Sequence, residues 1–296
     1  MKKRLIFSGA ATALVTPFRH GEIDFEALDG LIEKQIEGGI AALVVGGTTG
    51  EAATLSDVER KDLYTYVKGR IRGRTKLVFG TGTNDTRLAI KHTRCAHAIG
   101  ADGLLIVTPY YNKGTFSGVV EHYKRIAAET DIPIILYNVP SRTGVNLTIK
   151  QLEELSRLEN IVGIKEASDS VDRLTELIKF GDELFLYAGN DTQIYATLAL
   201  GGMGVISVLS NLYPESISRI CSDYFIGKRE AARKEQIKAF GLSKVMFIET
   251  NPSPIKYAMS LYGLCSSEVR LPLSEPSEEA KLAIEAELKL FRENNE

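Results

Sequence analysis

Lys165 has the residue type and the setting that imine chemistry requires. It directly follows the apolar run Ile161–Ile164, so it should point from a buried strand into the interior of the fold. Burial disfavours the ammonium and lowers the pKa of a lysine from about 10.4, and the neutral amine is the form that attacks a ketone. The alternative is a lysine that ends its strand and pairs with the neighbouring Glu166.

Several hydroxyl groups follow other apolar runs and could move protons near such an amine. Tyr137 ends the run before Lys165, so its hydroxyl could reach the lysine, although tyrosines at strand ends are also common as core residues. Thr48 and the Tyr110-Tyr111 pair end two further runs. These hydroxyls could form a proton relay with Tyr137.

Two residues are suited to bind carboxylates. Thr49 lies in the turn Gly47–Glu51, where hydroxyls and backbone amides can hold a carboxylate without a formal positive charge. Arg142 lies in a loop with Pro140 and Gly144, and its fork-shaped guanidinium suits a second carboxylate, unless it is simply a solvated loop arginine. Together these residues predict a cofactor-free imine site for oxo-acids.

The elements that must position these groups alternate between short apolar runs and segments with helical spacing. Such continuous runs are typical of parallel strands covered on both faces. Repeated eight times, the pattern predicts an α/β fold, a (β/α)8 TIM barrel. The competing doubly wound sheet usually has a G-x-G-x-x-G after its first strand, whereas this chain has Thr16-Pro17-Phe18 there. The eight expected strands are Ala11–Pro17, Ala41–Gly46, Lys76–Gly80, Gly103–Thr108, Pro133–Tyr137, Ile161–Ile164, Leu184–Tyr187 and Gly204–Val208.

Beyond Asn211 the pattern becomes mostly helical, over Pro214–Phe225, Lys228–Ile248 and Pro276–Asn294. We therefore expect residues 1–211 to form the barrel core with its first seven helices. Residues 212–296 should supply the last barrel helix and a C-terminal helical region.

Composition excludes several classes of protein. The chain of 296 residues is 44% hydrophobic and 25% charged, which supports a full core, and its net charge of −2 argues against nucleic-acid binding. Three cysteines and four histidines show no spacing typical of a metal site. Met1–Arg4 before an apolar stretch resembles the start of a secretory signal, but Ser8 and Gly9 interrupt it. We expect a cytoplasmic chain without a membrane span.

Five motifs, in order and in spacing, resemble the dihydrodipicolinate synthase and N-acetylneuraminate lyase superfamily over essentially the whole chain. They are G-T-T-G-E at Gly47–Glu51, T-P-Y-Y-N at Thr108–Asn112, Y-N-V-P-S-R-T-G at Tyr137–Gly144, G-I-K-E-A at Gly163–Ala167 and G-V-I-S-V at Gly204–Val208. The resemblance implies that Lys165 forms an imine with pyruvate and that Tyr137 transfers protons beside it. It implies that Thr48 links Tyr137 to Tyr111, which reaches the site of a neighbouring subunit.

The same resemblance implies how the substrates are held. Thr49 binds the pyruvate carboxylate, Arg142 binds the carboxylate of aspartate semialdehyde, and Gly189 and Ile206 line the pyruvate site. Arg142 and the Tyr110-Tyr111 pair favour the synthase branch, which makes 4-hydroxy-tetrahydrodipicolinate on the diaminopimelate route to lysine. The alternatives are a sibling aldolase for a 2-keto-3-deoxy sugar acid or N-acetylneuraminate, and a non-catalytic binding or regulatory barrel.

The resemblance also implies a homotetramer, a dimer of dimers, although some members are dimers. Lysine-inhibited synthases bind lysine near the dimer interface through a tyrosine, an asparagine, a glutamate and often a histidine. Tyr110 and Asn84 match the first two, but the glutamate position holds Leu88 and the histidine position holds Asp57. We therefore predict weak or absent inhibition by lysine.

Overall fold

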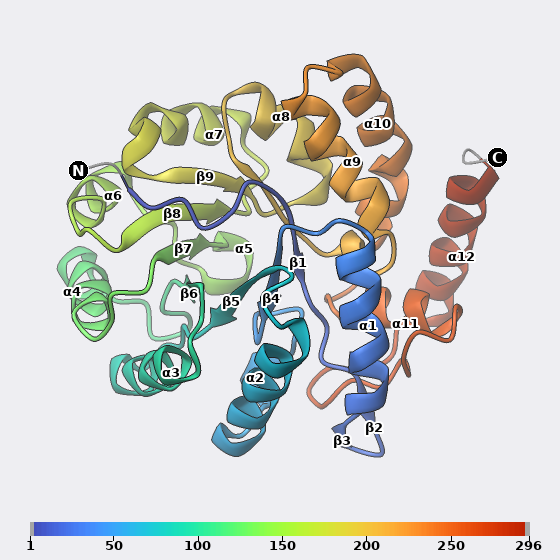
Figure 1. Cartoon of the computed structure of the whole chain (residues 1–296), viewed down its shortest axis with the longest axis horizontal. Coiled ribbons are helices and arrows are strands. Elements are labelled where there is room, and N and C mark those ends of the chain that lie inside the picture. The colour runs from blue at the N-terminus through green and yellow to red at the C-terminus, as the bar shows by residue number, and fades with distance from the viewer. Residues whose placement is uncertain (1–2, 294–296) are drawn as a thin grey trace.

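The computed structural model describes residues 3–293, and its centre is a closed barrel of parallel strands, as the sequence predicts (Figure 1). Each strand pairs with its neighbours in chain order, and the first strand also pairs with the last, Gly9 opposite Gly204. The barrel strands are β1 (Gly9–Ala13), β4 (Ala42–Val45), β5 (Lys76–Gly80), β6 (Gly103–Val107), β7 (Ile134–Asn138), β8 (Ile161–Glu166), β9 (Phe185–Ala188) and β10 (Gly204–Ser207).

Helices surround this barrel, and several begin at the side-chain caps that their sequences contain. Ser56 and Glu59 form the capping box of α2, and Asp24 caps α1. The surrounding helices are α1 (Phe25–Glu37), α2 (Asp57–Ile71), α3 (Thr86–Ile99), α4 (Phe116–Ala127), α6 (Ile149–Leu155), α7 (Val171–Leu177), α8 (Ile194–Ala199) and α9 (Pro214–Phe225). A four-residue helix, α5 (Pro140–Thr143), lies between β7 and α6.

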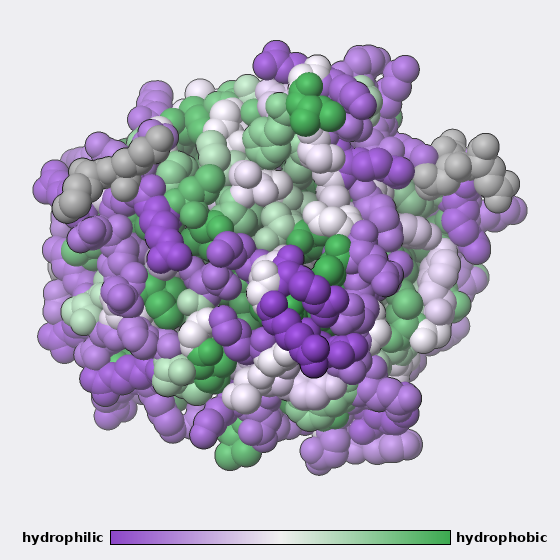
Figure 2. Space-filling view, in the orientation of Figure 1, coloured by the Kyte–Doolittle hydropathy of each residue, from purple (hydrophilic) through white to green (hydrophobic). Residues whose placement is uncertain are grey.

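The C-terminal region adds α10 (Arg229–Val245), α11 (Ser253–Ser260) and α12 (Glu278–Glu293). Helix α12 packs against both α10 and α11, and the three lie together on one side of the barrel (Figure 1). Figure 2 shows the face of the molecule that is turned to the viewer in Figure 1, and hydrophilic residues make up most of this face, with apolar residues scattered among them. No helix within residues 3–293 is both long and apolar enough to cross a membrane.

Several local features differ from the sequence expectation. The first strand was expected over Ala11–Pro17 but spans Gly9–Ala13, because the Val15 N–H turns to the Asn211 side chain and Pro17 has no N–H to donate. A two-stranded hairpin of β2 (Phe18–Arg19) and β3 (Glu22–Ile23) follows it, and α11 was also not expected. Short 3-10 turns occupy Ala52–Thr54, Ile178–Glu183, Asp191–Gln193 and Leu209–Asn211.

The barrel buries two apolar layers, and the alternation of side chains along each strand decides which residue enters which layer. On β7, Ile134 and Leu136 join the layer between strands and helices, whereas Ile135 and Tyr137 join the layer inside the barrel. Tyr137 is therefore directed into the barrel interior by its position in the strand.

A buried ion pair connects the C-terminal region to the turn after β4. Lys256 on α11 is 0% exposed, and its Nζ donates to the Glu51 carboxylate and to the main-chain oxygen of Glu268. The same nitrogen lies 4.3 Å from the centre of the Phe18 ring. Glu51 adopts a φ of +52°, which is uncommon for a residue other than glycine, and its second oxygen accepts the Arg270 N–H.

Removal of one member of this pair should destabilise the fold strongly. Lys256→Met leaves the Glu51 carboxylate buried without its cation, and we expect a loss of about 3–5 kcal/mol in the free energy of unfolding, measured by urea denaturation. The double variant Lys256→Met/Glu51→Gln removes both charges and should recover part of the loss. A single variant as stable as the unaltered protein would contradict this role.

Candidate active site

The end of β8 carries two charged residues that face opposite sides of the sheet. Val162 lies in the layer inside the barrel, and the pairing with β7 shifts register by one residue directly after Ile161. Beyond this shift Ile164 lies in the layer outside the barrel. Continued alternation directs Lys165 into the barrel mouth and Glu166 toward the helices. In the register of the sheet, Lys165 lies opposite Tyr137 of β7.

Lys165 is almost fully buried, with a relative exposure of 5%, and lines a cavity of about 1390 Å³ at the barrel mouth. Its Nζ lies 4.4 Å from the centre of the Tyr137 ring. The pKa of Lys165 is lowered to about 8, chiefly by burial; the negative charge of Asp191 raises it and the positive charge of Arg142 lowers it. A much larger fraction of neutral amine is therefore present near neutral pH than for an exposed lysine.

Tyr137 lines the same cavity, and its hydroxyl makes a hydrogen bond with the half-buried side chain of Thr48. Burial raises the pKa of Tyr137, while Arg142 and the Thr48 contact lower it. The phenol therefore keeps its proton near neutral pH and can donate it to, or exchange it with, a group on Lys165.

The two expected carboxylate-binding residues are joined by a third residue from the C-terminal region. The Asn251 Nδ2 donates to the Thr49 Oγ1 over 2.9 Å. The Arg142 Nη2 donates to the Asn251 main-chain oxygen over 3.2 Å. Thr49 and Arg142 both line the cavity that contains Lys165.

Gly189 and Ile206 occupy different positions relative to this cavity. Gly189 lines it, and a Cβ there would lie 2.6 Å from the Ala167 Cβ and 2.7 Å from the Glu166 main-chain oxygen, so no larger residue fits. Ile206 is fully buried on β10 in the apolar layer inside the barrel, together with Tyr137, and does not line the cavity wall.

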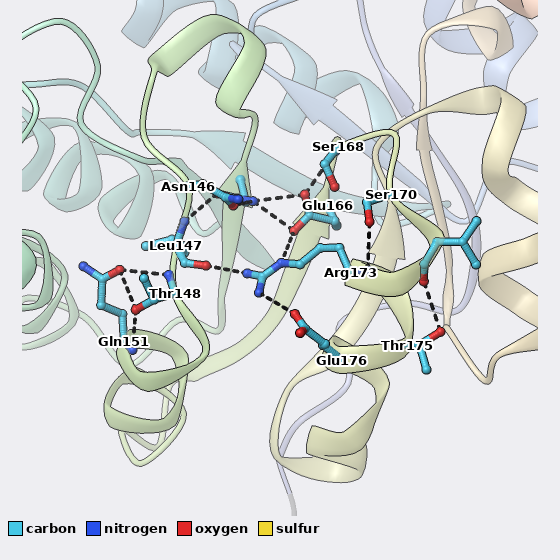
Figure 3. Close-up of polar contacts among 12 residues, drawn as sticks. Asn146, Leu147, Thr148, Gln151, Glu166, Ser168, Ser170, Arg173, Thr175 and Glu176 are labelled. Carbon is cyan, nitrogen blue, oxygen red and sulfur yellow. Dashed lines mark hydrogen bonds and ion pairs between the residues drawn. The ribbon is translucent and has the colours of Figure 1, made fainter.

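Glu166 is held away from Lys165 by a buried polar network (Figure 3). Its carboxylate accepts the Asn138 amide at 3.0 and 2.9 Å, and it forms an ion pair with Arg173 at 3.4 Å. The Ser168 N–H donates to the same carboxylate over 3.0 Å. The alternative in which Lys165 simply pairs with Glu166 is therefore not what the structure shows.

A second cavity is lined by Tyr110 and Asn84, whereas Tyr111 lies outside it. Tyr110 and Asn84 line a cavity of about 580 Å³, which Leu88 and Thr48 also line. Tyr111 lines neither cavity; it is 89% exposed and has a φ of +69°. Within one chain, therefore, the Tyr111 side chain is not directed into the site of Lys165.

Two residues at this mouth were not predicted from the sequence to be functional. Asn251 belongs to a proline-containing segment far from the barrel strands in sequence, so only the packing of the C-terminal region brings it to Thr49. Asp191 follows Gly189 at the end of β9, and its position after a barrel strand could have marked it.

Comparison with known proteins identifies relatives along nearly the whole chain. The model of the dihydrodipicolinate synthetase family matches residues 6–290. The 4-hydroxy-tetrahydrodipicolinate synthase of Clostridium novyi is 46% identical over 274 residues, which cover 92% of this chain and 93% of the relative. The enzyme of the same name from Thermotoga neapolitana is 46% identical over 278 residues, which cover 92% of this chain and 95% of the relative.

Solved structures agree with this assignment. The 4-hydroxy-tetrahydrodipicolinate synthase of Methylacidiphilum fumariolicum superposes with a TM-score of 0.95 at 40% identity, covering 97% of this chain and 96% of that one. The dihydrodipicolinate synthase of Thermotoga maritima superposes with a TM-score of 0.94 at 40% identity, covering 97% and 99%. The chain thus belongs to the dihydrodipicolinate synthetase family.

Proposed function

We propose that this protein condenses pyruvate with aspartate 4-semialdehyde to give 4-hydroxy-tetrahydrodipicolinate, through an imine on Lys165. The observation that carries the proposal is the buried Lys165 amine with its lowered pKa, beside a tyrosine that is hydrogen bonded to a threonine. Membership of the family and the names of the relatives give the substrates. The chemistry needs no cofactor.

The first half of the proposed mechanism uses Lys165 and Tyr137. The Lys165 Nζ attacks the carbonyl carbon of pyruvate, whose carboxylate is held by Thr49, and the former carbonyl oxygen leaves as water. The resulting imine withdraws electrons, so a methyl proton can be removed and an enamine forms. Tyr137, relayed through Thr48, carries protons to and from these atoms.

The second half of the mechanism uses Arg142. Arg142 binds the carboxylate of aspartate semialdehyde, and the enamine carbon attacks the aldehyde. The amino group of the new product then attacks the carbon that Lys165 holds, displaces the lysine and closes the ring. Asn251 supports this step because it contacts both Arg142 and Thr49, so the two carboxylate sites keep a fixed separation.

We also propose that the working unit is an oligomer, a homotetramer built from dimers, in the cytoplasm. The aromatic side chain of Tyr111 is 89% exposed and does not reach the Lys165 site of its own chain. Insertion of Tyr111 into a second copy would complete the hydroxyl relay with Thr48. One solved relative is described as a monomeric dihydrodipicolinate synthase variant, so assembly differs within the family.

Lys165→Ala should abolish covalent capture of pyruvate. Borohydride reduces an imine to a stable amine, so mass spectrometry should find a pyruvate adduct on the unaltered protein and none on the variant. The exposed Lys179→Ala is the matched control and should be captured normally. An adduct that persists in Lys165→Ala would show that another amine forms the imine.

Arg142→Ala should separate the two substrates. Capture of pyruvate on Lys165 should persist, whereas kcat/KM for aspartate semialdehyde should fall about 10- to 150-fold, because a hydrogen bond to a charged group is lost. Turnover is followed by coupling the product to an NADPH-dependent reductase. If the unaltered protein captures pyruvate but does not turn over aspartate semialdehyde, retro-aldol assays with sugar acids would identify a sibling aldolase instead.

We further propose that lysine inhibits the enzyme weakly or not at all. Leu88 lines the same cavity as Tyr110 and Asn84, and the family resemblance places it at the position of the glutamate that would bind the lysine ammonium. The carboxylate of Asp57, which also lines this cavity, is already bound to Lys91 and His92. Glu51, the other carboxylate that lines this cavity, is bound to Lys256, so neither carboxylate is free for the ammonium.

A lysine titration of the steady-state rate tests this proposal. The unaltered enzyme should keep its activity at sub-millimolar lysine, and Leu88→Glu should become more sensitive because it restores an acceptor for the ammonium. Leu88→Gln controls for the change in size. Strong inhibition of the unaltered enzyme at sub-millimolar lysine would contradict the proposal.

A further inference from the structure

Asp191 is a buried carboxylate at the barrel mouth that the mechanism above does not use. It begins the 3-10 turn that directly follows β9, the strand paired with β8. The Gly189 N–H donates to the Glu166 main-chain oxygen over 2.7 Å, which fixes this turn beside the end of β8. Asp191 and Lys165 are 2% and 5% exposed, and both line the cavity of about 1390 Å³.

The two oxygens of the Asp191 carboxylate differ in their hydrogen bonds. Asp191 Oδ2 accepts the N–H groups of Val208 and Leu209 at 3.0 and 2.9 Å, and the Ser207 hydroxyl also bonds to the side chain. Asp191 Oδ1 is buried, and no residue of the described chain makes a hydrogen bond to it. An asparagine could accept both N–H groups through its own oxygen, so the turn does not require a charge.

A buried negative charge is unfavourable unless a positive charge compensates it. Lys165 is the cation that enters the same cavity from the neighbouring strand. Burial, the largest effect, raises the pKa of Asp191 and lowers that of Lys165, while the charge of each residue shifts the pKa of the other in the opposite direction. Glu166 does not compensate the charge of Lys165, although the two are adjacent in sequence. Its carboxylate is bound to Asn138 and Arg173 on the outer side of the sheet (Figure 3).

We propose that Asp191 is the counter-charge of Lys165, and that it stabilises the positively charged nitrogen of the Lys165–pyruvate imine. The inference rests on the proposed function, because it assumes that Lys165 forms this imine. Asp191 is a positioning residue: it acts through the charge on Lys165 and forms no bond to the substrate.

The charge on Lys165 changes in a defined way during the reaction. The neutral amine attacks the pyruvate carbon, Tyr137 delivers a proton to the former carbonyl oxygen, and the C–O bond breaks with loss of water. The protonated C=N bond that remains therefore carries one positive charge, which is the charge of that proton. When a methyl proton leaves, its electron pair forms the C=C bond of the enamine and the C=N pair returns to nitrogen, so the charge disappears. A fixed negative charge nearby favours the charged imine over the free neutral amine, with no group oxidised or reduced.

Asp191→Asn is a sharp test because it removes the charge and keeps the acceptor for Val208 and Leu209. Without Asp191 the Lys165 ammonium is less stable, so its pKa falls from about 8 and the amine is available at lower pH. We expect the acid limb of the rate of imine formation to move about one unit toward lower pH, a tenfold change in the ratio of amine to ammonium. The rate is measured with pyruvate alone, by borohydride capture in single turnovers.

The other ionisable groups around this cavity are the same in the unaltered protein and in Asp191→Asn. They are Arg142 and Tyr137 near Lys165, Cys221 of α9 near Asp191, and Asp169, Lys244, Glu249 and Glu287 on the outer wall. Asp169→Asn is the matched control, because this exposed carboxylate lines the same cavity but is screened by water. It should leave the acid limb where it is in the unaltered protein.

A second variant tests the same inference if circular dichroism and urea unfolding show that Asp191→Asn folds poorly. Ser207→Ala removes a hydrogen bond to the carboxylate and should shift the limb in the same direction by a smaller amount. A folded Asp191→Asn whose acid limb stays in place would overturn the inference and leave Asp191 a cap for the turn. Failure of the unaltered protein to capture pyruvate would instead overturn the proposed function.

Discussion

The pairing of β1 with both β4 and β10 is the constraint on which the rest of the structure depends. Ala11 lies opposite Ala42 on one side and opposite Ile206 on the other, so the sheet closes. Closure removes both edges of the sheet and brings the carboxyl ends of all eight strands to one mouth. Groups from distant parts of the sequence can then converge on a single lysine.

Closure also gives one strand end two different environments. Lys165 points into the barrel, where it meets Tyr137 and loses most of its contact with water. Glu166, one residue later, points outward into a network with Asn138 and Arg173. Because Asn138 and Tyr137 are also successive residues, the outer network fixes the two strand ends whose inner side chains form the proposed imine site.

The sequence was sufficient to predict the barrel and the buried position of Lys165, because both depend on local patterns. Continuous apolar runs mark strands covered on both faces, and a lysine directly after such a run is conspicuous. The hairpin of β2 and β3 was missed because its strands have two residues each, too short for any periodicity. The shift of β1 toward Gly9 was missed because it depends on Asn211, almost two hundred residues away.

The site was harder to complete from sequence than the fold. Asn251 reaches Thr49 only because α11 packs beside the barrel, and no sequence pattern specifies that packing. The role proposed for Asp191 depends on an oxygen that accepts no hydrogen bond from any residue within 3–293, which only a structure reveals. Exposure of Tyr111 likewise has no sequence signature, since the strand end that precedes it looks like the others.

The ion pair between Glu51 and Lys256 has a consequence for the order in which a newly made chain matures. Glu51 lies in the turn that carries Thr48 and Thr49, but its cation lies about two hundred residues later. While the ribosome is still adding those residues, the turn lacks the partner that holds it, even after every barrel strand has emerged. The barrel strands can therefore pair before Lys256 is available to hold the turn that carries Thr48 and Thr49. The overall fold forms first, and the ability to bind substrate follows.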